Sequence, residues 1–414
     1  MIGGVHPGPA AAPATRGSWR AAAPAIAAMA WGGNHFTPLL LLYRQVESYS
    51  AAEVDLFLAF YIVGLVPGFL LAGPLSDRHG RQRLMGAGLL LGVVGSVVLA
   101  LGASGAGWLC LGRLVSGVSV AIAMVVGTSW VKELSGPPWD TAPAALGARR
   151  ASLTLTAGFG LGAGVSGVLA QWGPAPTVLP YLVHIVLSGV AAVPLARAAE
   201  TRAPDPRVRS LLADLRVPRA SRARFLGVVV PLAPWVFSAA GLAYAVTPAL
   251  VEGSVGRYRI AFATLLTVVT LGAGAGVQPF TGRIAAATGG RQLQVGMGLA
   301  LAGTALCAVE AVVRSPALAV VVGALLGLSY GVCLVSGLVE VQRMAGPHDL
   351  AGLTGIYYSL TYLGFALPVV LAELSAVTSY AVLLGGVALL CLGCGLTVAP
   401  DSRQNSVTAP SSTV

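Results

Sequence analysis

Charged side chains are scarce in this chain, since Asp, Glu, Lys and Arg together make up only 10% of its 414 residues. In soluble globular proteins about a quarter of the residues are charged. A chain with so few charged residues does not have enough of them to cover a surface that faces water. Hydrophobic residues make up 56% of the sequence, and the mean hydropathy is +0.81. Apolar runs of about twenty residues, long enough to cross a bilayer, follow one another almost without a break. We therefore expect an all-α polytopic membrane protein.

Enzyme signatures are absent as well. The sequence has no H-E-x-x-H, no G-x-S-x-G, no Walker loop and no aspartate pair of the kind that holds magnesium. These absences argue against ATP-driven transport and against catalysis, so we expect no enzyme activity, no cofactor and no metal site. The five cysteines lie inside or at the ends of apolar runs, where they act as small hydrophobic side chains, and no disulfide framework is expected.

Basic residues outnumber acidic ones by 25 to 15, and all but Lys132 are arginines. The net charge of +10 would suit a nucleic-acid partner, but the arginines stand in short stretches between apolar runs rather than on one amphipathic face. They are typical of loops that set membrane topology, and no nucleic-acid partner is expected. Arginine accumulates in alternate loops, which predicts a multi-pass protein of the cell (plasma) membrane with both termini in the cytoplasm.

The apolar runs predict twelve transmembrane helices, six in each half of the chain. The start of the second is the best defined, because Ser50 and Glu53 form an S-x-x-E capping box at the head of an apolar run. The predicted spans of the first half cover residues 21–42, 51–75, 84–102, 106–131, 149–171 and 177–197. Those of the second half cover residues 224–248, 258–281, 292–313, 316–342, 350–372 and 377–398.

A long polar stretch divides the two groups of six spans. Between Arg197 and Arg224 it carries eight arginines against three acids, together with three prolines. We interpret it as a linker between two helical bundles, although it could also be a long cytoplasmic loop of another twelve-span protein. The predicted parts are a cytoplasmic N-terminal tail at 1–20, a six-helix bundle at 21–197, a cytoplasmic linker at 198–223, a second bundle at 224–398 and a disordered cytoplasmic tail at 399–414.

The loop after the second predicted span carries a recognisable motif. Residues 73–83 read G-P-L-S-D-R-H-G-R-Q-R, which resembles the loop signature G-x-L-a-D-r-x-G-r-[RK] of the major facilitator superfamily (MFS). The resemblance implies two six-helix bundles related by a pseudo-two-fold axis, and a worn copy of the loop at 282–292 agrees with such an internal repeat. The gating residues that it implies are Gly73, Asp77, Arg78, Gly80, Arg81 and Arg83.

By this resemblance Asp77 would pair with arginine and with the N-terminal end of span eleven, closing the cytoplasmic side when the site faces outward. Glycine at position 80 suits the tight turn. The sequence departs from the signature at Gln82, where a basic residue is expected and the charge is displaced to Arg83. The gate therefore lacks its second arginine at the usual position.

Two further stretches resemble MFS motifs. In span four, Arg113 and Gly117 match R-x-x-x-G, which implies that Arg113 influences proton transfer or binds an anionic substrate group. The alternative is that Arg113 reaches the outer interface. Span five resembles in part the G-P-x-x-G-G motif of antiporters, although its glycines also suit close helix packing. The glycines assigned to helix packing are Gly117, Gly158, Gly162 and Gly167.

Polar and aromatic residues inside the spans are candidates for the substrate cavity. Asn34 and His35 in span one are the best of them, because a histidine can titrate near neutral pH; the alternative is a packed, hydrogen-bonded pair. Glu310 and Glu340 fall near span ends and are interpreted as interfacial. Aromatic candidates for the cavity, each of which could instead be a packing residue, are Trp235, Tyr330, Tyr358 and Tyr362.

Together these features predict a monomeric secondary active transporter with a small-molecule substrate, protons and the lipid bilayer as its partners. We expect an antiporter that exports drug-like compounds, which would give drug resistance, or secondary metabolites. The efflux is expected to be coupled to protons and to proceed by alternating access. The alternative is proton-coupled uptake of a metabolite such as a sugar or organic acid. A membrane-embedded enzyme or a sensor on the same scaffold is a more remote alternative.

Overall fold

The computed structural model describes residues 19–46, 49, 51–204, 217, 219–344 and 350–398. Most of the predicted N-terminal tail, Ser50 of the capping box, the centre of the linker and the tail at 399–414 lie outside these residues. Every regular element in the described part of the chain is helical. This confirms the predicted all-α class.

Ten helices are long and apolar enough to cross a membrane, within the described residues. The expected first span is broken: α1 (Trp19–Asn34) ends before a turn at residues 35–38, and α2 (Leu39–Val46) follows. Pro38 explains the break, because it has no N–H and disfavours helical backbone in the residue before it. The expected sixth span is the shorter apolar helix α8 (Leu179–Leu195).

The remaining helices follow the predicted spans closely. In the first half they are α3 (Ala51–His79), α4 (Arg81–Ala100), α5 (Ala106–Ile122), α6 (Thr128–Leu134) and α7 (Ala144–Trp172). In the second half they are α9 (Arg222–Arg224), α10 (Val230–Gly241), α11 (Thr247–Leu250), α12 (Glu252–Val255), α13 (Arg259–Val277), α14 (Thr281–Ala287), α15 (Gln292–Val313), α16 (Pro316–Met344), α17 (Leu350–Tyr362), α18 (Ala366–Leu374) and α19 (Tyr380–Thr397).

Two of the long helices, Ala106–Leu134 and Arg222–Leu250, contain π-helical turns, one in the first and two in the second, a feature that often marks functional sites. These turns are Ala123–Gly127 between α5 and α6, Phe225–Val229 between α9 and α10, and Leu242–Val246 between α10 and α11. In each case the flanking helices continue through the turn, so they form one long rod.

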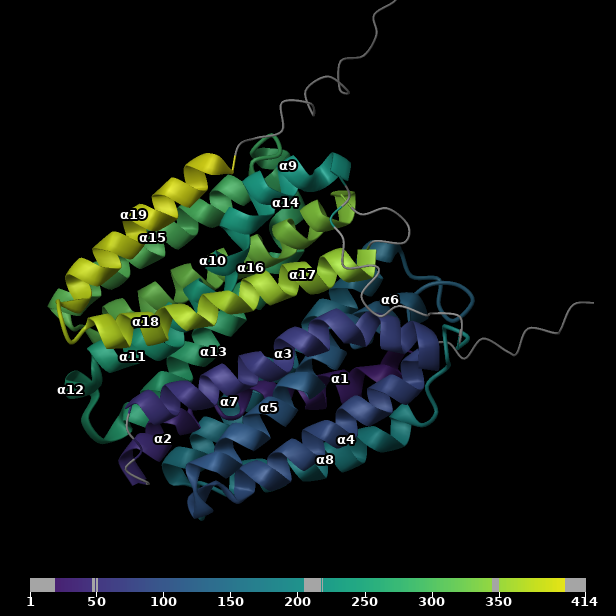
Figure 1. The fold of residues 1–414 in the computed structure, drawn as a ribbon, viewed down its shortest axis with the longest axis horizontal. Coiled ribbons are helices and arrows are strands. Elements are labelled where there is room, and N and C mark those ends of the chain that lie inside the picture. The colour runs from purple at the N-terminus through teal and green to yellow at the C-terminus, as the bar shows by residue number, and fades with distance from the viewer. Residues whose placement is uncertain are drawn as a thin grey trace, which may run out of the picture.

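The helices of the two halves lie on two sides of the molecule. In Figure 1 the purple-to-teal helices up to α8 lie on one side, and the teal-to-yellow helices from α9 lie on the other. In the described part of the chain the sides meet mainly through two helix pairs: α3 packs against α17, and α7 packs against α13. Gly355 brings α17 so close to α3 that an added Cβ would stand 2.7 Å from the carbonyl oxygen of Phe69.

Candidate functional site

A cavity lies where the two sides of the molecule meet, and it encloses about 590 Å³ of space not filled by atoms, part of it open to solvent. One wall comes from the first half, with Asn34, Thr37, Tyr61 and Arg113 as its polar residues. The other comes from the second half and is aromatic. Its aromatic residues are Phe237, Tyr244, Tyr330, Tyr362 and Phe365.

Arg113 is the charged residue of this lining, and its side chain is only 2% exposed. Its guanidinium carbon lies 3.9 Å from the centre of the Tyr61 ring and 4.8 Å from that of Phe36. One terminal nitrogen donates to the carbonyl of Gly33 at 3.3 Å. The side chain therefore points into the protein, and the alternative that it reaches the outer interface does not fit this geometry.

Asn34 lies beside Arg113 in the cavity wall and is held from two directions. Its amide nitrogen donates to the carbonyl of Phe159 at 3.1 Å, and its oxygen accepts from the hydroxyl of Thr37 at 2.6 Å. Asn34 is thus a pre-oriented polar group at the point where α1 ends.

The aromatic candidates divide into two groups. Tyr330 and Tyr362 line the cavity, while Trp235 and Tyr358 are buried but do not belong to its lining. Tyr358 instead stacks on Phe69, with ring centres 5.4 Å apart.

Sequence reasoning missed several lining residues, Phe237 and Tyr61 among them. Phe237 contacts Tyr362 with a ring separation of 4.1 Å, and Tyr61 stacks with Arg113. An aromatic residue in an apolar helix gives no local sign of which face it occupies, so only packing could reveal them.

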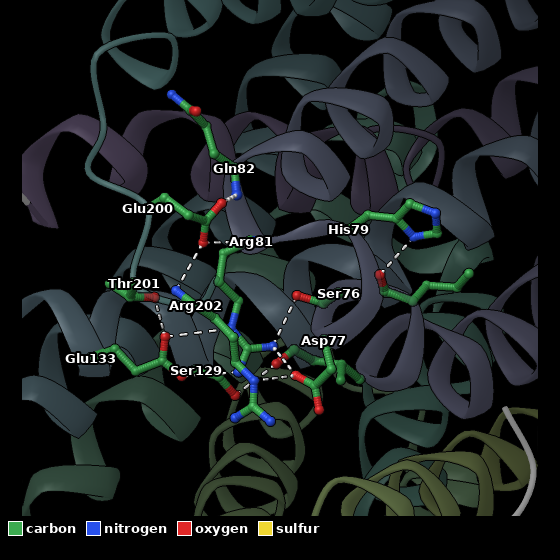
Figure 2. Close-up of polar contacts among 12 residues, drawn as sticks. Ser76, Asp77, His79, Arg81, Gln82, Ser129, Glu133, Glu200, Thr201 and Arg202 are labelled. Carbon is green, nitrogen blue, oxygen red and sulfur yellow. Dashed lines mark hydrogen bonds and ion pairs between the residues drawn. The ribbon is translucent and has the colours of Figure 1, made fainter. Parts of the chain in front are cut away.

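A network of charged side chains gathers at the far end of α3 (Figure 2). The carboxylate of Asp77 lies 3.3 Å from Arg81 and 3.1 Å from Arg202, which follows α8. Arg81 also reaches Glu133 on α6 at 3.0 Å and the hydroxyl of Ser76 at 2.9 Å. Three helices of the first half, α3, α4 and α6, and the segment after α8 are thereby joined by alternating charges.

Glu200 binds the start of α4 in the same region (Figure 2). Its two carboxylate oxygens accept from the backbone N–H groups of Arg81 at 2.9 Å and Gln82 at 3.0 Å. A carboxylate at a helix N-terminus satisfies N–H groups that have no partner within the helix and complements the helix dipole. Gly80, at φ 93°, makes the turn that lets α4 start here.

Gln82, which departs from the loop signature, connects two helices through its side chain. Its amide nitrogen lies within hydrogen-bonding distance of the carbonyls of Leu195, Ala196 and Ala198, at 3.2, 3.1 and 3.2 Å. These carbonyls are at and just beyond the end of α8, where a helix leaves acceptors unpaired. Gln82 therefore joins α4 to α8, while Arg202 supplies the second cation for Asp77.

The comparisons with known proteins agree with this architecture. The family model of the Major Facilitator Superfamily matches residues 21–369. The chain belongs to this superfamily. It is therefore a membrane transporter rather than an enzyme, as expected from the sequence, and it acts on small molecules within the membrane.

Two named proteins resemble the chain over different lengths. A chloramphenicol resistance protein of Pseudomonas aeruginosa is 24% identical over 341 residues, which cover 80% of this chain and 77% of that protein. Sugar transporter ERD6-like 15 of Arabidopsis thaliana is 35% identical over 86 residues, but the match spans only 21% of this chain and 18% of that protein.

Solved structures show the same fold. A structure of the nucleoside transporter NupG has a TM-score of 0.67 at 12% identity and covers 92% of this chain and 98% of its own. The human organic anion transporter MFSD10 (TETRAN) has a TM-score of 0.67 at 17% identity and covers 93% and 100%. At these identities the likeness concerns the fold alone.

The motif residues of this MFS protein take different positions around the loop. Gly73 is buried in α3, and Asp77 and Arg81 belong to the charged network. Arg78 and Arg83 are exposed, and the side chain of neither forms a hydrogen bond or ion pair with another described residue. Sequence reasoning missed Glu133, Glu200 and Arg202. The signal that could have identified them is that each is a charged residue next to a helix end.

His35 does not line the cavity of this MFS protein. Its ring is fully buried among Tyr181 and His184 of α8, with ring centres 5.0 and 5.1 Å away, and neither ring nitrogen has a hydrogen-bond partner among the described residues. His184 differs, since its nitrogens lie 2.7 Å from the Ser96 hydroxyl and 3.0 Å from the carbonyl of Ala28. The alternative of a hydrogen-bonded Asn34–His35 pair does not fit these contacts.

The glycines of α5 and α7 lie where helices approach closely. A Cβ at Gly117 would meet the backbone of Tyr61, and a Cβ at Gly158 would meet that of Ala27. At Gly162 it would stand 2.6 Å from the carbonyl oxygen of Trp31. Gly167 faces Thr264 of α13, so it lies between the two halves of the chain.

Glu310 and Glu340 lie near the ends of α15 and α16, and both side chains are packed inside the protein rather than exposed at its surface. Glu310 is 0% and Glu340 is 3% exposed. Glu340 pairs with Arg224, and its second oxygen lies 3.8 Å from Arg343.

Proposed function

We propose that this MFS protein is a proton-coupled exporter of small organic molecules, built from twelve transmembrane segments in two six-helix bundles at 21–197 and 224–398. The bundles rock about the cavity, so that it opens to one side of the membrane at a time. The observation that carries the proposal is that residues of both halves wall one cavity, as alternating access requires. Both termini lie in the cytoplasm, and the protein works as a monomer.

The charged network around Asp77 acts as the cytoplasmic latch in this proposal. Asp77 follows Tyr61 of the cavity by sixteen positions in α3, which corresponds to about 24 Å along the helix. The network thus lies well away from the cavity, at the helix end that the arginine distribution assigns to the cytoplasm. The proposed contact between Asp77 and the start of span eleven stays a prediction; the ion pairs of Asp77 with the described residues are those with Arg81 and Arg202.

Export is supported by three features. The cavity lining is aromatic and apolar with few polar groups, which suits amphiphilic compounds better than sugars. The glycine-rich α7 resembles the antiporter motif in part, and a relative over most of the chain is named a chloramphenicol resistance protein. Proton coupling is supported by His35, a titratable side chain buried one residue from the cavity-lining Asn34.

The test uses everted membrane vesicles from cells that express the protein. Three aromatic dyes, one anionic, one neutral and one cationic, are offered with and without a protonophore that collapses the proton gradient. We expect at least one dye to accumulate in wild-type vesicles only while the gradient persists, and to fail with Asp77→Asn. Asp140→Asn is the matched control, because Asp140 forms its ion pair with Arg150 at 2.7 Å, outside the network.

Uptake is the competing direction, and the same material tests it. Accumulation in right-side-out vesicles driven by the gradient, with none in everted vesicles, would show that the protein imports. Dye accumulation that is the same with and without the protonophore would exclude proton coupling.

A further inference from the structure

The cavity of this protein has an electrostatic asymmetry. Its lining includes the guanidinium of Arg113 but no Asp or Glu among the described residues. No ion pair joins Arg113 to a carboxylate in the described part of the chain, and its Nε has no hydrogen-bond partner there. A buried charge without a counter-charge is costly in a membrane protein, and such residues mark sites where a partner binds.

The groups around Arg113 compensate only part of this charge. The Tyr61 and Phe36 rings offer their negative faces, and the carbonyl of Gly33 accepts one hydrogen bond at 3.3 Å. None of these groups is an anion. An arginine guanidinium matches a carboxylate or a phosphate with two parallel hydrogen bonds, and such charge-assisted bonds are about twice as strong as neutral ones.

The opposite wall offers a different chemistry. Phe237, Tyr362 and Phe365 form a continuous aromatic surface, with Phe237 centred 4.1 Å from Tyr362 and 4.9 Å from Phe365. Phe237 comes from α10, Tyr362 from the end of α17 and Phe365 from the segment that joins α17 to α18, so all three move with the second half of the chain. The cavity is therefore cationic on one side and aromatic on the other.

We infer that the substrates are organic anions with an aromatic body: the anionic group binds Arg113 in the first half, and the ring packs on the Phe237–Phe365 surface of the second half. This rests on the proposed function and names its substrate class. A molecule bound in this way contacts both halves at once. The inside-negative membrane potential favours export of an anion by about 2.3 kcal/mol per charge per 100 mV, so the substrate charge agrees with the direction proposed above.

The test measures binding to the purified full-length protein in detergent, which requires no transport. Three probes share one ring system and differ in charge: 1-naphthoate, 1-naphthylmethanol and 1-naphthylmethylammonium. We expect naphthoate to bind about tenfold or more tighter than the alcohol, as the strength of a charge-assisted hydrogen bond predicts, and the ammonium to bind weakest. Binding is read from quenching of tryptophan fluorescence and from the shift in the thermal unfolding midpoint.

Two variants assign the preference to Arg113. Arg113→Gln should bring naphthoate to the level of the alcohol, whereas Arg283→Gln, which removes an exposed arginine of α14, should retain the wild-type ranking. If Arg113→Gln fails to fold, Asn34→Asp replaces it. That change adds a carboxylate to the same wall with little change in volume, and it should abolish the preference for naphthoate.

The inference is overturned if the ammonium or the alcohol binds as tightly as naphthoate, if naphthoate has no effect at millimolar concentration, or if Arg113→Gln keeps the preference. Failure of the proposed function has a different signature. Naphthoate would then bind through Arg113, but vesicles would show no gradient-driven movement of it. Gradient-driven movement of cations alone would preserve the exporter and exclude the anion site.

Discussion

The carboxylate of Asp77 lies 3.1 Å from Nε of Arg202, although Asp77 lies in the last turn of α3 and Arg202 follows α8. The loop signature places its second cation at position 82, where this chain has glutamine. Here the missing charge comes from the segment after the first bundle, which also carries Glu200 and Thr201 into the network. The start of the linker is therefore part of the proposed latch.

Replacement of Arg202 by glutamine should weaken the latch without unfolding the protein. Arg202 is 52% exposed, so its pair with Asp77 is screened by solvent, and such pairs contribute up to about 1 kcal/mol. We expect the gradient-driven transport rate to change by at most about fivefold, with a smaller effect at high salt. Arg197→Gln, an exposed arginine five residues earlier, is the control; an equal effect of both variants would contradict a specific pair.

The hydrogen bonds of Gln82 predict which substitutions its position accepts. Gln82→Leu removes the amide that lies within hydrogen-bonding distance of three carbonyls at and just beyond the end of α8, and we expect the free energy of unfolding to fall by about 1 kcal/mol. Gln82→Arg keeps N–H donors there and restores the family's basic residue, so it should be tolerated. Thermal unfolding in detergent measures both, and equal midpoints for the two variants would show that the carbonyl contacts contribute nothing.

Gly162 and Gly160 form a matched pair on α7. An added methyl group at Gly162 would stand 2.6 Å from the Trp31 carbonyl oxygen, whereas at Gly160 it would meet nothing within 4 Å. We expect Gly162→Ala to destabilise the protein by about 1–3 kcal/mol through overpacking. Gly160→Ala should be neutral or stabilising, because alanine favours the helix more than glycine does. Similar unfolding midpoints for both variants would contradict the close approach of α1 and α7.

The two buried histidines should respond differently to phenylalanine. His184→Phe leaves the Ser96 hydroxyl and the Ala28 carbonyl without the imidazole, and should cost about 1–3 kcal/mol of folding free energy. His35→Phe breaks no hydrogen bond, so we expect near-normal stability but loss of gradient-driven transport. Full transport with His35→Phe, measured in vesicles at several pH values, would exclude His35 as the proton carrier.

The amino-acid sequence by itself determined the membrane environment, the approximate spans and the family. These follow from local signals: the lack of charge, apolar runs of bilayer length, arginine-rich loops and one eleven-residue motif. Each can be recognised without knowing which helices touch, because the bilayer acts on every span separately.

Only the tertiary structure decided which side chains meet. Arg202 reaches Asp77, Gln82 binds the end of α8, and His35 turns into the first half while Asn34 faces the cavity. In helices that are apolar on nearly every face, hydrophobic periodicity does not show which face lies inside. The face that lies inside is decided by the glycines at which helices approach closely and by the pairing of a few polar groups. Both depend on residues far apart in the chain.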